Sequence, residues 1–204
     1  EKSDSIEVPK LAFLPLMQRR RLSSLGRVVL STLYPLCDKY GRGNNSPSSV
    51  ILASRWGDIQ LTVKALEELS SEKTLSPTGF STSVHNTIGG LFSMFAHFTG
   101  NITSMAAGEN TIGSALTEAK AQLVEYPLVF VSIYEDKTPE VFDKYGKIPF
   151  PFAVTLVLSN ETDRDCALAW KEHLVAKNVS DAPILTQLYE FLTWLDTERR
   201  HEGE

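Results

Sequence analysis

The chain contains 204 residues, of which 42% are hydrophobic, and it carries a formal net charge of −5. This length allows one sizeable buried core, so we expect a single domain over residues 1–204 rather than two domains. The acidic balance argues against general nucleic-acid binding, because neutralising phosphates requires clustered Lys and Arg in excess.

Cysteine usage and the hydropathy pattern indicate the cellular compartment of the protein. Cys37 and Cys166 form neither a metal-ligand pair nor a disulfide framework, which fits a reducing compartment. No apolar run reaches the roughly 18 to 20 residues that a membrane-spanning helix needs, and no signal peptide is visible at the start. We therefore expect a cytoplasmic protein without a membrane span.

The first part of the chain combines a helical pattern with a strand pattern. We expect residues 1–13 to be a leader or loop. Apolar residues at helical spacing predict a helix over 18–38, although Pro35 should end or kink its last turn. The turn-rich segment 41–49 is expected to be a loop, and the short apolar run 50–54 a strand buried on both faces.

A second helix is predicted over 58–72. We expect it to bury five apolar side chains, those of Ile59, Leu61, Val63, Leu66 and Leu69. Pro77 and Gly79 mark a loop that leads away from this helix.

The stretch 80–119 is the centre of the predicted fold. Apolar residues at helical spacing predict a helix over 84–98, in which Gly89 and Gly90 would let another backbone approach closely. The small and apolar run 101–107 is predicted to be a strand. A tight turn then leads into a further helix, so the layout is helix, strand, turn, helix.

The last part of the chain adds two strands and one helix. Strands are predicted over 126–136 and 152–160, with a charged, Pro-rich excursion over 137–151. An amphipathic helix is predicted over 181–194, followed by a polar tail over 196–204; its apolar stripe is Leu185, Leu188, Leu192 and Leu195. Strands that alternate with helices predict an α/β layer architecture.

Four motifs stand out along the chain: RRRLSSLGR at 19–27, SRWGD at 54–58, LSPTGFSTSVHNTIGG at 75–90 and AAGENT at 106–111. In this order they resemble the β-ketoacyl synthases, or ketosynthases, of the thiolase superfamily. A complete ketosynthase has two similar halves, and this chain resembles the first. The resemblance implies a reduced, thiolase-like ketosynthase N-terminal half, with a mixed sheet covered by helices.

In that family a turn after a strand carries a nucleophilic Cys. Matching Asn86, Gly89, Gly90 and Gly100 to the family pattern brings the nucleophile position to Gly108, where no Cys is present. The closer likeness is therefore to the chain-length factors, which are inactive partners of an active ketosynthase. Among these, the chain is most similar to the short form found with aryl polyene gene clusters.

Condensation by a ketosynthase needs a thiolate that holds the acyl chain and two His that assist decarboxylation and stabilise the oxyanion. The family places both His in motifs of the second half that do not occur here. The chain has four His, and we expect them to be packed or on helix surfaces: His85, His97, His173 and His201. Glu109 could act as a base, or it could cap the following helix.

The resemblance also indicates which residues meet a partner. Bulky residues of chain-length factors close the far end of the partner's acyl tunnel, and Trp56, Ile59 and Phe80 match that wall by position. Phe92 and Phe95 fit either ordinary core packing or the tunnel. The strand that contains Ile102 would pair with its counterpart across a two-fold axis.

The arginines at 19–21 allow two interpretations. They could dock an acidic acyl carrier protein by charge complementarity, or they could be a solvated helix start.

We therefore expect a noncatalytic chain-length factor that forms a heterodimer with an active β-ketoacyl-ACP synthase and shapes its acyl tunnel. The pathway would be type II fatty-acid-like or polyketide, most plausibly aryl polyene synthesis. No cofactor is expected, and the acyl carrier protein would be reached through the partner. The alternative is a stand-alone acyl-thioester enzyme, a thioesterase or acyltransferase, on a truncated thiolase-like fold.

Overall fold

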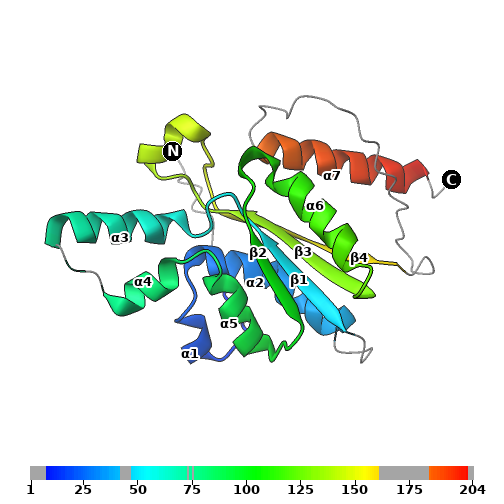
Figure 1. The fold of residues 1–204 in the computed structure, drawn as a ribbon, viewed down its shortest axis with the longest axis horizontal. Coiled ribbons are helices and arrows are strands. Elements are labelled where there is room, and N and C mark those ends of the chain that lie inside the picture. Colours follow the sequence, from blue (N-terminus) through cyan, green and yellow to red (C-terminus); the bar gives the residue numbers. More distant parts are fainter. Residues whose placement is uncertain (1–7, 42–46, 73, 75, 161–183, 202–204) are drawn as a thin grey trace.

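The computed structural model describes residues 8–41, 47–72, 74, 76–160 and 184–201. These residues form a four-stranded mixed sheet in the order β2-β1-β3-β4 (Figure 1). The strands are β1 (Ser48–Ala53), β2 (Asn101–Met105), β3 (Leu128–Glu135) and β4 (Phe152–Ser159). The first three run parallel, and β4 pairs antiparallel with β3. The predicted mixed sheet is confirmed.

Helices cover both faces of the sheet. α2 and α5 lie on one face, and α6 and α7 lie on the other, as Figure 1 shows. The helical elements are α1 (Leu16–Arg19), α2 (Ser24–Leu36), a π-helical turn η1 (Cys37–Gly41), α3 (Ile59–Glu72), α4 (Pro77–Ser83), α5 (Thr87–Ala96), η2 (Gly108–Asn110), α6 (Thr111–Gln122), η3 (Glu140–Tyr145) and α7 (Ile184–His201).

The sheet separates two hydrophobic cores. Along β1, Val50 and Leu52 pack on the α2 and α5 side, whereas Ile51 and Ala53 pack on the α6 and α7 side. This alternation follows from the two-residue period of a strand. Every residue of β1 and β3 is buried, as expected for parallel strands with helices on both faces.

The first long helix starts later than the sequence pattern predicted. Ser23 caps α2, because its Oγ accepts a hydrogen bond from the Gly26 N–H at 3.0 Å. The segment before it forms the separate short helix α1. Pro35 lies inside the last turn of α2, and the chain continues into the π-helical turn η1.

The predicted loop at Pro77 and Gly79 is wrong, because these residues belong to helix α4. Ser76 caps this helix by accepting a hydrogen bond from the Gly79 N–H at 3.3 Å. Pro77 takes the first helical position, where its missing N–H costs nothing and its fixed φ suits the helix. A Ser-Pro pair is thus a helix start here.

The predicted burial of helix α3 is also largely wrong. Ile59 is 6% exposed, but Leu66 and Leu69 are 58% and 48% exposed. The reason is that α3 extends beyond the end of the sheet and packs against α4 rather than against a core (Figure 1). Its amphipathic pattern therefore has an apolar face that the described residues leave uncovered.

The described end of segment 1–13, residues 8–13, contains no helix or strand, and Leu11 within it is buried in the core beside α2. The last helix continues to His201, through part of the expected polar tail. Cys166, His173 and residues 181–183 lie outside the described residues. Within the described residues, no helix is long and apolar enough to cross a bilayer.

The two glycines of α5 have different surroundings. A Cβ at Gly89 would lie 3.0 Å from the Leu52 side chain and 3.1 Å from that of Ile102, so this position lets α5 sit close to β1 and β2. A Cβ at Gly90 would meet no described atom within 4 Å. The close approach predicted for both glycines therefore applies to Gly89 and is wrong for Gly90.

This difference predicts opposite responses to the same substitution. Gly90→Ala should raise the free energy of unfolding by about 0.5–1 kcal/mol, because Ala favours a helix over Gly and no neighbour obstructs it. Gly89→Ala should lose most or all of that gain through crowding against Leu52 and Ile102. Urea unfolding of both variants measures the difference, and equal stabilisation would show that α5 does not sit tightly on the sheet.

Candidate functional site

The candidate site lies where three parallel strands end. The carboxyl ends of β1, β2 and β3 meet at one edge of the sheet, and the segments that follow them carry Arg55, Glu109 and Asp136. In open α/β sheets, ligands bind outside this edge. The SRWGD and AAGENT motifs both fall there.

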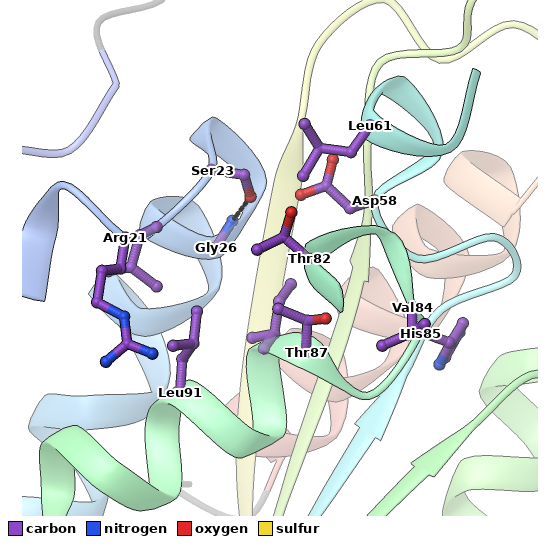
Figure 2. Close-up of a pocket in the computed structure, with 12 residues that line it drawn as sticks. Arg21, Ser23, Gly26, Asp58, Leu61, Thr82, Val84, His85, Thr87 and Leu91 are labelled. Atoms are coloured by element: carbon purple, nitrogen blue, oxygen red, sulfur yellow. Dashed lines mark hydrogen bonds between the residues drawn. The ribbon is translucent and has the colours of Figure 1, made fainter. Parts of the chain in front are cut away.

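A small pocket with a mixed polar and apolar lining lies beside this edge, between the starts of α2, α3 and α5 (Figure 2). The carboxylate of Asp58 faces Ser23 and Thr82 in it. Burial raises the pKa of Asp58, and hydrogen bonding to Ser23 opposes that shift. The pocket has a volume of about 20 Å³, which is room for about one water molecule. It is therefore too small for an acyl substrate.

His85 lines the same pocket and is packed, as expected for a His without a catalytic setting. Its Nε2 lies 2.9 Å from the carbonyl oxygen of Ser54. A Cβ at Gly57 would lie 3.0 Å from the His85 ring, and Gly57 has a φ of +62° that favours glycine. His85 therefore stabilises the chain just after β1.

The turn after β2 has the predicted shape. Gly108 adopts a φ of +56°, a left-handed conformation that favours glycine. The Thr111 hydroxyl closes the turn: it donates to the Gly108 carbonyl at 2.7 Å and accepts from the Ala107 N–H at 3.1 Å. A Cβ at Gly108 would meet no described atom within 4 Å. The position is therefore open, but it carries no side chain.

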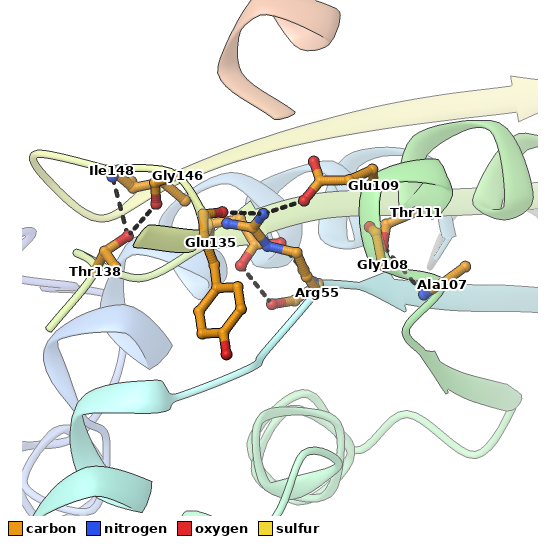
Figure 3. A network of polar contacts seen from close by, with 11 residues as sticks. Arg55, Ala107, Gly108, Glu109, Thr111, Glu135, Thr138, Gly146 and Ile148 are labelled. Carbon is orange, nitrogen blue, oxygen red and sulfur yellow. Dashed lines mark hydrogen bonds and ion pairs between the residues drawn. The ribbon is translucent and has the colours of Figure 1, made fainter. Parts of the chain in front are cut away.

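Glu135, at the end of β3, is a buried carboxylate that joins two strands. It is 1% exposed, and it accepts hydrogen bonds from the Ser54 hydroxyl at 3.2 Å and from the Arg55 backbone N–H (Figure 3). Burial raises its pKa to about 7, although the Arg55 N–H and guanidinium favour the charged form and oppose the shift. Glu135 thus fixes the backbone where β1 ends.

Arg55 connects the end of β1 to two other segments. Its Nη1 donates to the Glu109 carboxylate and to the Tyr145 carbonyl oxygen, the latter at 3.0 Å. Figure 3 shows the guanidinium beside Glu109, and its Cζ lies 3.8 Å from the centre of the Trp56 ring. Glu109 pairs with Arg55, and no side-chain cap is present on α6. Sequence reasoning missed this pair, because its members are 54 positions apart.

Trp56 belongs to an aromatic cluster at this edge. Its ring centre lies 5.4 Å from that of Phe142 and 6.2 Å from that of Tyr145, both in η3. The sequence analysis described η3 only as part of a charged excursion. Trp56 is half-buried, so part of its ring remains accessible from outside the chain.

The other predicted site residues lie in different settings. Phe92 and Phe95 are buried at 0% and 4% exposure in the core between α2, α5 and the sheet. Phe80 is 59% exposed on α4, and Ile102 is half-buried on the edge strand β2. Among the described residues, no cluster of three or more His, Cys, Asp or Glu is placed to hold a metal ion.

The raised pKa of Glu135 predicts a specific pH dependence. Between its ordinary value of 4.5 and about 7, the folded chain keeps this proton while the unfolded chain loses it. Stability should therefore fall as pH rises through this range, by up to about 3 kcal/mol, and then level off. Glu135→Gln removes this fall and leaves that of Asp136, whose pKa burial raises to about 6.

Urea unfolding at several pH values tests this. The free energy of unfolding of Glu135→Gln minus that of the natural chain should rise from pH 4.5 to pH 7. A difference that stays constant or falls over this range would contradict the raised pKa of Glu135.

Comparisons with known proteins agree with this geometry. A family model described as the β-ketoacyl synthase N-terminal domain matches residues 1–200. A search of curated proteins finds no significant match. Among solved structures, a chain of the ketosynthase (ApeO) in complex with its chain length factor (ApeC) from Xenorhabdus doucetiae is 26% identical, with a TM-score of 0.65. That alignment covers 76% of this chain and 64% of the other.

Two further structures share the fold. A β-ketoacyl synthase from Burkholderia phymatum STM815 is 14% identical, with a TM-score of 0.55 over 69% of this chain and 37% of the other. The ishigamide ketosynthase/chain length factor is 12% identical, with a TM-score of 0.61 over 79% of this chain and 50% of the other. This chain thus spans less than two thirds of each of the three.

The predicted thiolase-like N-terminal half fold is confirmed by these matches. Since the family model covers nearly the whole sequence, this chain belongs to the β-ketoacyl synthase family, in which it corresponds to the N-terminal domain.

Proposed function

We propose that this chain is a noncatalytic chain-length factor that pairs with an active ketosynthase and limits the acyl chain built there. The turn at Gly108 carries the proposal. It has the left-handed conformation and open surroundings of a position after a strand, but Gly supplies no nucleophile. The similarity to a ketosynthase and chain length factor complex supports the same role.

The proposed partner supplies what this chain lacks. An active ketosynthase would contribute the thiolate and both His, and it would receive the acyl carrier protein. The Arg19–Arg21 cluster is partly engaged within the chain, since Arg19 donates to the Lys10 carbonyl oxygen at 3.1 Å and Arg21 lies 5.9 Å from the Phe95 ring centre. These contacts favour the solvated helix start, in which Arg20 and Arg21 are exposed, over docking of the carrier protein.

The edge of the sheet supports association through β2. Strand β2 is an outer strand, and its side chains are exposed or half-buried. An edge strand with free backbone groups is suited to pairing with another chain. We propose that β2 pairs with the equivalent strand of the ketosynthase across a two-fold axis.

Exposed apolar side chains also lie on α3 and α4. Leu66 and Leu69 of α3 and Phe80 of α4 are each roughly half exposed or more, and α3 packs against α4. Exposed apolar side chains are typical of an interaction site where they lie together. The exposure of Phe80 supports the proposed position of this residue at the tunnel wall.

We extend the proposal to the pathway and the location. The aryl polyene proposal rests on the RRRLSSLGR, SRWGD, LSPTGFSTSVHNTIGG and AAGENT motifs, and cysteine usage that fits a reducing compartment supports a cytoplasmic heterodimer. Within that heterodimer Trp56 and Phe80 would wall the tunnel, whereas Ile59 is 6% exposed and would support the fold. Phe92 and Phe95 would support the fold.

The β2 interface predicts the effect of a proline. Ile102→Pro removes a backbone donor from the edge strand and should prevent stable heterodimer formation on size-exclusion chromatography after co-expression. Leu156→Pro, on the opposite edge strand β4, is the matched control and should leave the heterodimer intact. Survival of the heterodimer with Ile102→Pro, in a chain that remains folded by circular dichroism, would require a different interface.

The tunnel-wall role predicts longer products for Trp56→Ala in the heterodimer, because the truncation opens the far end of an apolar tunnel. Phe92→Ala is the control: it should cost about 3–5 kcal/mol of stability without changing product length, since Phe92 is fully buried in the core. Mass spectrometry of the polyene products measures the lengths. Unchanged length with a destabilised Trp56→Ala chain would assign Trp56 to structure.

A further inference from the structure

We propose that Arg55 is a positioning residue that holds the Trp56 ring in place and thereby sets product length, an inference that rests on the proposed function. Arg55 is 8% exposed, although an arginine side chain is usually solvated. A buried guanidinium needs partners, and each partner here comes from a different segment. The Arg55 side chain therefore connects these segments and is not a solvated surface charge.

The first anchor is the turn at the Gly108 position. Glu109 follows Gly108 directly, and its carboxylate pairs with Nη1 of Arg55. The Arg55 side chain is 5% exposed, so this ion pair is only weakly screened by solvent from the arginine side. Through Glu109, the orientation of the guanidinium depends on the conformation of the turn.

The second anchor is η3. The Tyr145 carbonyl oxygen accepts from the same Nη1 at 3.0 Å, while the Tyr145 ring contacts Trp56 edge-on. Thr138 fixes the segment around η3: its hydroxyl donates to the Gly146 carbonyl at 3.2 Å and accepts from the Ile148 N–H at 3.0 Å (Figure 3). Nη1 of Arg55 thus has two hydrogen-bond partners, the Glu109 carboxylate and the Tyr145 carbonyl oxygen, in addition to the guanidinium contact with Trp56.

The guanidinium lies against the face of the Trp56 ring. The distance from Cζ to the ring centre is 3.8 Å, within the range of a cation–π interaction, which is strongest for Trp. Phe142 packs on the ring at a tilted angle. Because Arg55 itself is fixed by Glu109 and Tyr145, its planar surface restricts the rotation of Trp56.

One feature of Arg55 indicates that stability is not the reason for this arrangement. Its Nε is buried and has no hydrogen-bond partner among the described residues. A buried donor without a partner lowers stability, so an apolar side chain of similar size would fill this space at less cost. The arrangement is instead suited to holding an aromatic ring at one angle.

Lysine cannot replace this function. A Lys at position 55 would keep the charge for Glu109, but its compact ammonium lacks the plane that covers the Trp56 ring. Methionine would keep the length of the side chain and lose both the ion pair and the cation–π contact. Glu109→Gln would keep the Arg55 guanidinium that stacks on Trp56 and would weaken the contact with residue 109 that anchors it.

The test has a first arm that needs no partner. In a Trp170→Phe, Trp194→Phe background, Trp56 is the remaining tryptophan, and its acrylamide quenching reports how far the guanidinium covers its ring from solvent. Arg55→Met and Arg55→Lys should raise the quenching constant about twofold, and Glu109→Gln should raise it less. Arg27→Met, which removes a half-buried arginine that donates to the Arg19 carbonyl oxygen at 3.0 Å, should leave it unchanged.

The second arm uses the heterodimer. Arg55→Met and Arg55→Lys should still co-elute with the ketosynthase and should broaden the product-length distribution, whereas Arg27→Met should not. Unchanged quenching and unchanged product lengths in Arg55→Met would overturn the inference. Failure of the natural chain to form the heterodimer would overturn the proposed function instead. Changed quenching with unchanged product length would show that Arg55 positions Trp56 without affecting product length, and would reject the inference.

Discussion

The hydrogen bonds of Glu135 and Arg55 at the ends of β1 and β3 are the constraint on which the candidate site depends. Glu135 accepts hydrogen bonds from the Ser54 hydroxyl and the Arg55 backbone N–H, and this fixes the direction in which the chain leaves β1. Arg55 then reaches Glu109 beside the Gly108 turn. Three segments far apart in sequence are therefore joined through one buried carboxylate and one buried guanidinium.

This arrangement explains how a ketosynthase-like turn could persist without a nucleophile. The turn keeps its left-handed glycine and its Thr111 hydroxyl bonds, and its neighbouring carboxylate serves an ion pair. In the proposed heterodimer, that ion pair orients the Trp56 ring, which would form part of the wall of the acyl tunnel. The apolar surface of α3 and the free edge of β2 provide the area that association with a partner would bury.

Much of the fold was predictable because its strands are short apolar runs and its main helices have a clear period. The errors have local causes. Ser76 and Pro77 start a helix but resemble a loop signal, and α3 has an amphipathic pattern whose apolar face the described residues leave uncovered. The ion pair of Arg55 and Glu109 could not be predicted, since only the pairing of β1 with β2 brings these residues together.

The central claim is that this chain takes part in acyl-chain synthesis without carrying the acyl group. The most direct test is intact-mass spectrometry of the heterodimer, co-expressed with the ketosynthase from the same gene neighbourhood and incubated with an acyl carrier thioester. The account predicts an acyl adduct on the ketosynthase and none on this chain. A covalent adduct on any residue of this chain would contradict it and favour a stand-alone acyl-thioester enzyme.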